Sequence, residues 1–422
     1  MLKNHALLVC LFFSLNVFSQ PATDTIPLSL HDAETKLIQN NLLLVAANYN
    51  IEANKALIIQ AKLWDNPVLN TDQNIYDSKF FRHTTINGQP YGQVFIQLLQ
   101  LFKTAGKRSK LAEMSATTAK QAELQFTDVL RNLKYALRTN YYSALQLSQT
   151  NKLYRQERDE LEKLLTGMKA EYAAGNISQK ELLRIQALQL SLKQSIADNY
   201  KQYTDINSQL KLLLQEDKNV WYLPQAGNDT IVSPVIPTMD SLVTKAQKNN
   251  PDYLSEQNLL LFQQQNLTYQ KALKVPDITA GVEYDRASSY TPNYWGLAIS
   301  LPLPLLNHNQ GNIKAAQQYV KQEETLVQLK DKKLLNDIQN AMAKLQLSLQ
   351  VLQSADLQFY PQYEQLFYNA TQSYKQRQLG LLEYIDLFEA YRDTQLQYQQ
   401  QKLSYRKAIE DLHYTIGTDV IK

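Results

Sequence analysis

The five histidines are the side chains of this chain best suited to metal binding or to general acid–base catalysis. Their spacing matches no metal-ligand motif, and the sequence contains no HExxH segment, no glycine-rich phosphate loop and no arrangement typical of an activated nucleophile. We therefore predict that the protein is not an enzyme and binds no metal and no cofactor. The histidines are His5, His31, His83, His308 and His413.

The composition favours long helices over a loop-rich globule. The chain has 422 residues, among which Tyr is frequent (26) while Gly (11) and Pro (13) are scarce, and Gln is visibly enriched. The net charge of +3 gives no electrostatic reason to expect a nucleic-acid partner.

The N-terminus has the pattern of a secretory signal peptide over residues 1–19. Lys3 precedes an apolar run from Ala6 to Phe13, and Ser19 offers a small-residue cleavage site. The run is too short to span a bilayer. The single cysteine, Cys10, lies inside this segment, so the mature chain is predicted to contain no disulfide. We expect an exported protein.

Internal repetition predicts a duplicated architecture. The segment KLIQNN at 36–41 recurs as KAQKNN at 245–250, an offset of 245 − 36 = 209. The segment YAAGNISQKELLR at 172–184 parallels YKQRQLGLLEYID at 374–386, an offset of 374 − 172 = 202. The predicted division is a signal peptide (1–19), a first repeat (20–215), a linker (216–238), a second repeat (239–418) and a tail (419–422).

Each repeat is predicted to contain a helix, two strands and two long helices. No proline or other breaker interrupts the chain between Gly106 and Tyr172. Apart from Pro361, a second helix is predicted to run from Asn312 to Gln372, and its ~60 residues would form a rod of roughly 90 Å. A rod of that length suits a spacer or the wall of a tube. The predicted coiled-coil seam of this helix comprises Leu335, Ile338, Met342, Leu345, Leu349 and Leu352.

The predicted strands alternate apolar and polar residues. In Asp277–Asp285 every second residue is apolar, and Asn87-Gly88 marks a turn in the corresponding part of the first repeat. Aromatic residues flank these strands: Tyr294, Trp295 and Tyr91. The pattern is typical of outer-membrane barrel strands, although a half-buried soluble hairpin alternates in the same way. The signal peptide and the attached rods favour the barrel, with the aromatic residues at the membrane interface.

The stretch SLPLPLLNHNQGN is predicted to be a junction between a strand and a helix. Pro302 and Pro304 remove two backbone donors from the same side of the strand, so the hydrogen-bonded ladder must end there. The polar residues before Gly311 are predicted to end the strand, and Asn312 would cap the next helix. Gly106 is the equivalent residue of the first repeat.

The segments SLPLPLLNHNQGNIKAAQ and AAGNISQKELLRIQALQLSL, together with the duplicated plan, resemble the TolC family of outer-membrane efflux proteins, in its heavy-metal and multidrug branch. The resemblance implies a mainly α fold with a small β part, built from long antiparallel coiled-coil hairpins. Three subunits would each give four strands to one twelve-stranded transmembrane β-barrel. Independently of the resemblance, four strands cannot close a barrel, so the chain is expected to oligomerise.

The resemblance also implies a function and partners. The protein would be a homotrimeric channel in the outer membrane of a Gram-negative bacterium, in contact with its lipid, and would extend into the periplasm. It would export small molecules or ions together with a periplasmic adaptor protein and an inner-membrane pump. The sequence does not distinguish a metal ion, a drug or a metabolite as the cargo. The alternative is a periplasmic coiled-coil adaptor or a structural protein without channel activity.

Acidic gate residues at the periplasmic tip are a further implication of the resemblance. Aligned on Tyr374, they fall on Glu383 and Asp386, which are three residues apart and therefore share a helix face. In a trimer six carboxylates would surround the axis and favour cation entry. Glu181 matches Glu383 in the first repeat, whereas Arg184 stands where the second repeat has Asp386, and their pairing would lock the tip. The alternative is an ordinary solvated helix surface.

A basic segment, KTAGKRSK at 103–110, follows the predicted first-repeat strand. Two interpretations stay open for it: contact with anionic lipid head groups, or a solvated start of a helix.

Overall fold

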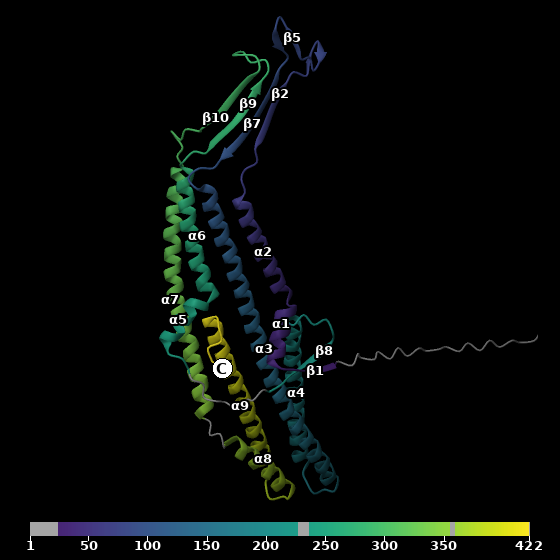
Figure 1. Cartoon of the computed structure of the whole chain (residues 1–422). Helices are drawn as coiled ribbons and strands as arrows, with labels where there is room; N and C mark the ends of the chain where they lie inside the picture. The colour runs from purple at the N-terminus through teal and green to yellow at the C-terminus, as the bar shows by residue number, and fades with distance from the viewer. Residues whose placement is uncertain (1–23, 227–235, 355–358, 422) are drawn as a thin grey trace, which may run out of the picture.

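The computed structural model of the protein describes residues 24–226, 236–354 and 359–421 (Figure 1). The predicted signal peptide, with His5 and Cys10, lies outside the described residues. The molecule is elongated, with a small sheet at one end and the turns of two helical hairpins at the other (Figure 1). No described helix combines the length and the apolar character needed to cross a membrane.

The same order of elements occurs twice along the chain, which is the predicted duplication, except that each repeat begins with two helices rather than one. The first repeat contains α1 (Leu30–Asn40), α2 (Leu42–Lys62), β2 (Val68–Gln73), β7 (Val94–Phe102), α3 (Lys107–Ala173) and α4 (Gln179–Leu213). The second contains α5 (Met239–Asn249), α6 (Pro251–Leu273), β9 (Ile278–Asp285), β10 (Tyr294–Ser300), α7 (Gln310–Ser354), α8 (Phe359–Lys375) and α9 (Leu381–Ile416).

The long helix of the first repeat has the predicted length and packing. Helix α3 has 67 residues, which at 1.5 Å per residue gives a rod of about 100 Å. Its apolar stripe is buried in the core: Leu137 and Ala144 are 0% exposed, and the stripe packs against α1 and the end of α4. A helix of this length is stabilised by such packing along its side rather than by its ends.

The predicted continuous helix from Asn312 to Gln372 is described as two helices. Helix α7 ends at Ser354 and α8 begins at Phe359, and residues 355–358 lie outside the described residues. Pro361 lies in the first turn of α8, where the missing amide hydrogen costs no intrahelical bond.

The predicted seam of α7 was wrong at two positions. Leu334 and Ala341 are buried in it, whereas Leu335 is 43% exposed and Met342 only packs against the cluster from the side. Adjacent leucines point about 100° apart around a helix, so the packing of the partner helices decided which one faces inward.

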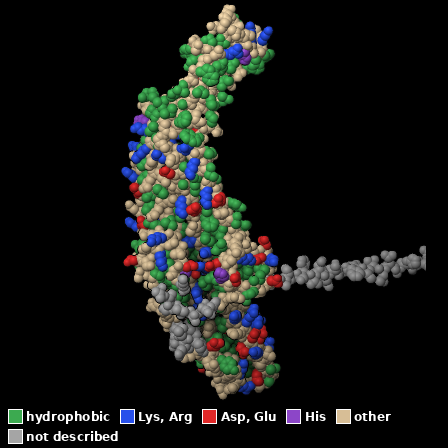
Figure 2. Space-filling model, viewed as in Figure 1, with side chains coloured by type: hydrophobic (Ala, Val, Ile, Leu, Met, Phe, Trp, Pro, Cys, Tyr) green, Lys and Arg blue, Asp and Glu red, His purple; other side chains and the backbone are tan. Residues whose placement is uncertain are grey.

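The largest sheet is antiparallel, with the strand order β10-β9-β7-β2. Leu98 of β7 lies opposite both Val282 of β9 and Leu69 of β2, and Leu297 of β10 lies opposite Val282. Directly opposite residues share a face, so these four side chains form one apolar surface. Figure 2 shows apolar side chains gathered over the sheet, while charged side chains gather along the helices.

The other face of the sheet carries a polar cluster. The Gln97 amide donates a hydrogen bond to Glu283 at 2.8 Å and accepts one from Asn70 at 3.1 Å. The alternation predicted for 277–285 is confirmed in β9, whereas in β7 the face of Gln97 also carries Phe95 and Leu99. Strands β2 and β10 are the edges of the sheet, and neither pairs along its outer side with another described strand.

Two short hairpins lie in the connection between β2 and β7. One pairs β3 (Tyr76–Asp77) with β4 (Lys79–Phe80), and the other pairs β5 (Thr84–Ile86) with β6 (Gln89–Tyr91). Asn87 and Gly88 have φ values of 50° and 80°, as expected for the predicted tight turn.

A separate two-stranded sheet lies beside the middle of the helices. Strands β1 (Asp24–Leu28) and β8 (Val220–Pro224) pair in parallel, and β8 lies within the residues that the sequence predicts as a linker. Asn207 of α4 anchors β8, because its side chain donates to the Val220 carbonyl and accepts from the Tyr222 amide. The first part of the predicted linker is therefore packed against the helices.

Candidate functional site

The two helical hairpins, α3–α4 and α8–α9, end side by side at the helical tip (Figure 1). Their turns have the same geometry: Gly175 and Arg377, 377 − 175 = 202 residues apart, both adopt left-handed backbone with φ values of 75° and 62°. Across the two turns, the Arg377 guanidinium lies 2.5 Å from the Glu171 carboxylate. Both side chains are largely exposed, so this ion pair is a weak contact in water.

Tyr374 holds the two hairpins together. Its ring stacks on Tyr384 of α9 with 4.8 Å between the centroids, and its hydroxyl donates to Met168 Sδ of α3 at 3.7 Å. Burial raises the pKa of Tyr374, so the hydroxyl stays protonated and remains a donor. The geometry gives Tyr374 a packing role at the tip.

Glu181 and Glu383 occupy the same position, the third residue of α4 and of α9. The Ser178 amide donates to Glu181 at 2.8 Å, which completes a capping box and lowers the pKa of Glu181. The equivalent N-cap of α9 is Gly380, which has no side chain to complete the box. The Glu181 carboxylate is therefore committed to the helix end, whereas that of Glu383 is exposed.

Glu383 and Asp386 share the exposed side of α9, while Leu381, Tyr384 and Phe388 pack inward. Within the described part of one chain neither carboxylate forms an ion pair. Arg184 also makes no ion pair there, so a single chain does not contain the predicted contact between Arg184 and Asp386. The carboxylates remain available to solvent or to another copy of the chain.

A buried carboxyl group, Glu157 of α3, was missed by the sequence analysis. It is 2% exposed, and neither of its oxygens has a hydrogen-bond partner among the described residues. Burial raises its pKa to about 8, although the charge of Arg392 opposes the shift. The available signal was its spacing, because Glu157 continues the buried stripe of Tyr154, Leu161 and Leu164.

The junction between the sheet and the helices has a different geometry in each repeat. Gly106 is the N-cap of α3, and its φ of 65° favours glycine. Strand β10 ends at Ser300, two residues before Pro302 and four before Pro304. Helix α7 begins at Gln310, earlier than predicted, so Gly311 and Asn312 lie in its first turn and Asn312 is not its cap.

A salt bridge ties the two junctions together. Lys107, at the start of α3, is 5% exposed and lies 2.6 Å from Asp277, which comes just before β9. The same carboxylate accepts from the Thr104 amide at 2.8 Å. This buried pair satisfies its own hydrogen bonds, and it holds the strands of one repeat against the helix of the other.

The sequence and the fold match known proteins. Residues 35–215 match the model of the outer membrane efflux protein family. The match therefore covers most of the first repeat. A curated relative of this chain is the cobalt-zinc-cadmium resistance protein CzcC of Cupriavidus metallidurans, which is 22% identical over 366 residues, 87% of this chain and 84% of CzcC.

Solved structures share the fold of this chain. CusC, which forms a transmembrane channel, matches with a TM-score of 0.75 and 16% identity over 99% of both chains. The open state of the MtrE outer membrane channel of Neisseria gonorrhoeae matches with a TM-score of 0.72 and 14% identity, over 93% of this chain and 89% of MtrE. The predicted mainly α fold with a small β part is confirmed, and the matches support the predicted resemblance to outer-membrane efflux channels.

The predicted interface aromatics lie at the end of the sheet that is remote from the helices. Trp295 is 72% exposed and its ring lies 5.2 Å from that of Tyr284. Tyr294 begins β10, and Tyr91 ends β6, where its hydroxyl donates to Asp77.

A buried arginine joins three other segments of the chain to α3. Arg138 of α3 lies 2.5 Å from Glu34 of α1, 3.0 Å from Glu410 of α9 and 2.7 Å from Asp419.

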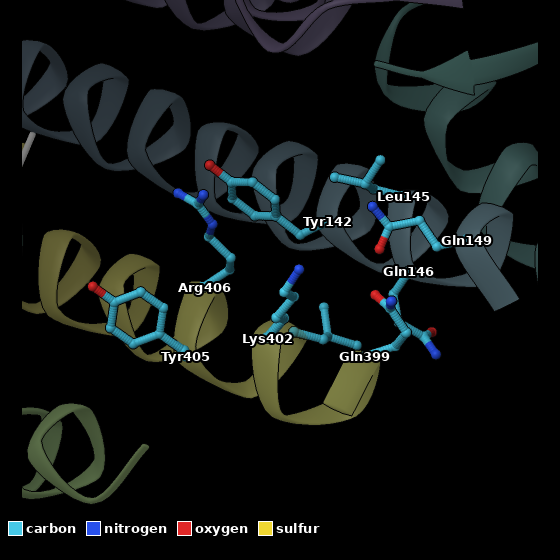
Figure 3. Close-up of a pocket in the computed structure, with 9 residues that line it drawn as sticks. Tyr142, Leu145, Gln146, Gln149, Gln399, Lys402, Tyr405 and Arg406 are labelled. Carbon is cyan, nitrogen blue, oxygen red and sulfur yellow. The ribbon is translucent and has the colours of Figure 1, made fainter. Parts of the chain in front are cut away.

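A narrow cavity lies between α3 and α9, a short distance along these helices from Arg138. Figure 3 shows Tyr142 of α3 on one wall and Arg406 of α9 on the other. No group of three or more His, Cys, Asp or Glu suited to a metal ion occurs among the described residues.

Proposed function

We propose that three copies of this chain close into one channel that carries small molecules or ions out of the periplasm. The observation that carries this proposal is the four-stranded sheet, which has one largely apolar face, a polar cluster on the other face, and no described strand paired along either edge. In a membrane, unpaired backbone groups at β2 and β10 would be costly, so each edge requires a strand from a neighbouring copy.

Three copies of four strands give 3 × 4 = 12 strands. A ring of this size lies between the small barrels filled by side chains and the wide porins, so it leaves room for a polar lumen. The face with Gln97 and Glu283 would line that lumen, and the face with Leu98 and Val282 would meet lipid. The long helices would continue the conduit into the periplasm.

In this arrangement the helical tip points away from the outer membrane. Glu383 and Asp386 would gather around the axis as a cation-favouring gate, and a periplasmic adaptor and an inner-membrane pump would dock at the helices. CzcC is a cobalt-zinc-cadmium resistance protein, which makes divalent metal cations the first cargo class to test.

The test is the state of the full mature chain after extraction from bacterial envelopes. We expect extraction only with detergent, a mass of three chains, and stepwise ion conductance after reconstitution into a planar bilayer. A monomer that stays in solution without detergent would contradict the proposal and support the alternative of a periplasmic adaptor or structural protein.

A further inference from the structure

A basic cavity lies where the sheet meets the helices in the first repeat. It has a volume of about 440 Å³ and is bordered by the end of α2, the end of β7 and the start of α3. Its charged lining consists of Lys62, Lys103 and Arg108 with one acid, Asp65, which lies 3.1 Å from Lys103. Three cations and one carboxylate leave an excess of positive charge, which suits an anion.

Two of the three cationic groups of this cavity, those of Lys62 and Arg108, form no ion pair with any described residue, whereas Lys103 pairs with Asp65. The Arg108 guanidinium stacks over the Trp64 ring at 3.7 Å. It forms no hydrogen bond with any described residue, and its shielded Nη1 atom is without a partner. Lys62 is exposed and makes no ion pair in the described part of the chain. A guanidinium with unused donors is well suited to bind a phosphate in two-pronged geometry.

The cavity continues into the apolar face of the sheet. Trp64 is 58% exposed and meets Phe102 edge to face, with 6.2 Å between the ring centroids. Phe102 is the last residue of β7, four positions from Leu98, so both side chains lie on the apolar face. Gln100 lies between these two residues on the same face, but the neighbouring strand β9 presents Val282, Ala280 and Ile278 there. A largely apolar surface therefore extends from the sheet to Trp64 and ends at the cations.

We propose that this cavity binds the head group of an anionic phospholipid, with the acyl chains along the apolar face of the sheet. The inference rests on the proposed placement of the sheet in a membrane. Lys62, Lys103 and Arg108 contact the lipid phosphate, and Trp64 lies at the boundary between head group and chain. The other two lysines of the basic segment are occupied: Lys107 pairs with Asp277, and Lys110 donates to the Ala105 carbonyl.

The second repeat lacks this cavity lining and supplies a matched control. Leu273 takes the place of Trp64 at the offset of 273 − 64 = 209, and Lys271 takes the place of Lys62. Lys271 and Lys274 are exposed at the end of α6. Their removal changes the charge at the corresponding junction without touching the proposed site.

The experiment measures quenching of Trp64 by brominated lipids. The chain has three tryptophans, so Trp221→Phe and Trp295→Phe leave Trp64 as the only reporter. The full mature protein is reconstituted into phosphatidylcholine vesicles that contain either brominated phosphatidylglycerol or brominated phosphatidylcholine. We expect stronger quenching by the anionic lipid, and a smaller difference at high salt.

Removal of the cations should weaken this preference. Lys62→Gln and Arg108→Gln should each lower it about fivefold, the ratio that corresponds to about 1 kcal/mol per cation near an anionic surface. Lys62→Gln also leaves the stack of Arg108 on Trp64 intact. Lys271→Gln with Lys274→Gln should leave the preference unchanged.

Three outcomes would overturn the proposal. Equal quenching by the two lipids would show that the cavity has no preference for the anionic lipid, although the sheet lies in the membrane. A preference that survives Lys62→Gln and Arg108→Gln would place the site elsewhere. Absence of quenching by either lipid would contradict the membrane placement itself, and with it the proposed function.

Discussion

Asn41 and Asn250, 250 − 41 = 209 residues apart, make the same contacts in the two repeats. The Asn41 side chain accepts from the Leu43 amide at 3.0 Å and donates to the Leu213 carbonyl at 3.0 Å. The Asn250 side chain accepts from the Tyr253 amide at 3.0 Å and donates to the Thr415 carbonyl at 2.8 Å. Each buried amide therefore caps one helix and fastens it to the last helix of its own repeat.

Asn41→Ala and Asn250→Ala are each expected to lower the free energy of unfolding by about 1–3 kcal/mol. Each removes a helix cap and leaves a buried carbonyl without its donor. Urea unfolding followed by circular dichroism would measure the loss. Asn54→Ala is the control, because Asn54 is half-buried and its side chain bonds only to Asn50 of its own helix. A loss of stability in only one of the two variants would contradict the equivalence of Asn41 and Asn250.

Arg138→Met is expected to destabilise the protein by about 3–5 kcal/mol. The substitution leaves the carboxylates of Glu34, Glu410 and Asp419 without the cation that pairs with them. Arg138→Lys should restore only part of the stability, because an ammonium group cannot make the two-pronged contact with Asp419. Thermal unfolding in detergent checks both variants. An unchanged melting temperature in Arg138→Met would show that the cluster does not hold the segments together.

Glu157→Gln is expected to stabilise the protein at high pH. The pKa of Glu157 is raised from 4.5 to about 8, so between these values the folded state keeps a proton that the unfolded state releases. Stability therefore falls as the pH rises through this window. Above about pH 8 the gain in the variant should be on the order of a few kcal/mol, at about 1.4 kcal/mol per pKa unit. Below pH 4.5 it should vanish.

The free energy of unfolding, measured across this pH range for the parent protein and for Glu157→Gln, tests the predicted direction of the change. Glu160→Gln is the matched control, one turn further along α3. A hydrogen bond from Lys163, followed by one from Lys375, lowers the pKa of Glu160, so its removal should give no gain at high pH. A gain in the control, or none in Glu157→Gln, would contradict the assignment.

Glu383→Gln combined with Asp386→Asn is expected to lower the cation-to-anion permeability ratio of the reconstituted channel severalfold. The double variant removes six carboxylates from the tip of a trimer and with them the local attraction for cations. Reversal potentials under a salt gradient give the ratio. Glu324→Gln is the control, because Glu324 is exposed and lies in the half of α7 nearer the sheet. It should leave the permeability ratio unchanged. An unaltered permeability ratio in the double variant would contradict the proposal that these carboxylates form a gate.

The elements themselves could be predicted because their signals are local. The length of α3 follows from the absence of breakers between Gly106 and Tyr172, and the strands follow from alternation. The repetition of Asn41 at Asn250 was visible as a repeated motif. The two-sided sheet follows from the same alternation, because a strand places successive side chains on opposite faces.

By itself, then, the sequence determined the longest helix, the main strands, their duplication and the resemblance to a family. It did not predict the two helices that begin each repeat or the parallel pair β1 and β8. The tertiary structure decided which charged groups are buried, paired or free. Glu157 and Glu160 are three residues apart on α3. Among the described residues, the carboxyl of Glu157 has no hydrogen-bond partner, whereas that of Glu160 pairs with Lys163 of the same helix and with Lys375 of α8. Lys107 and Arg108 are neighbours, but within the described part of the chain only Lys107 pairs with a carboxylate. Burial, and pairs such as Lys375 with Glu160 or Lys107 with Asp277, depend on residues that are distant in sequence, and no local pattern encodes those contacts.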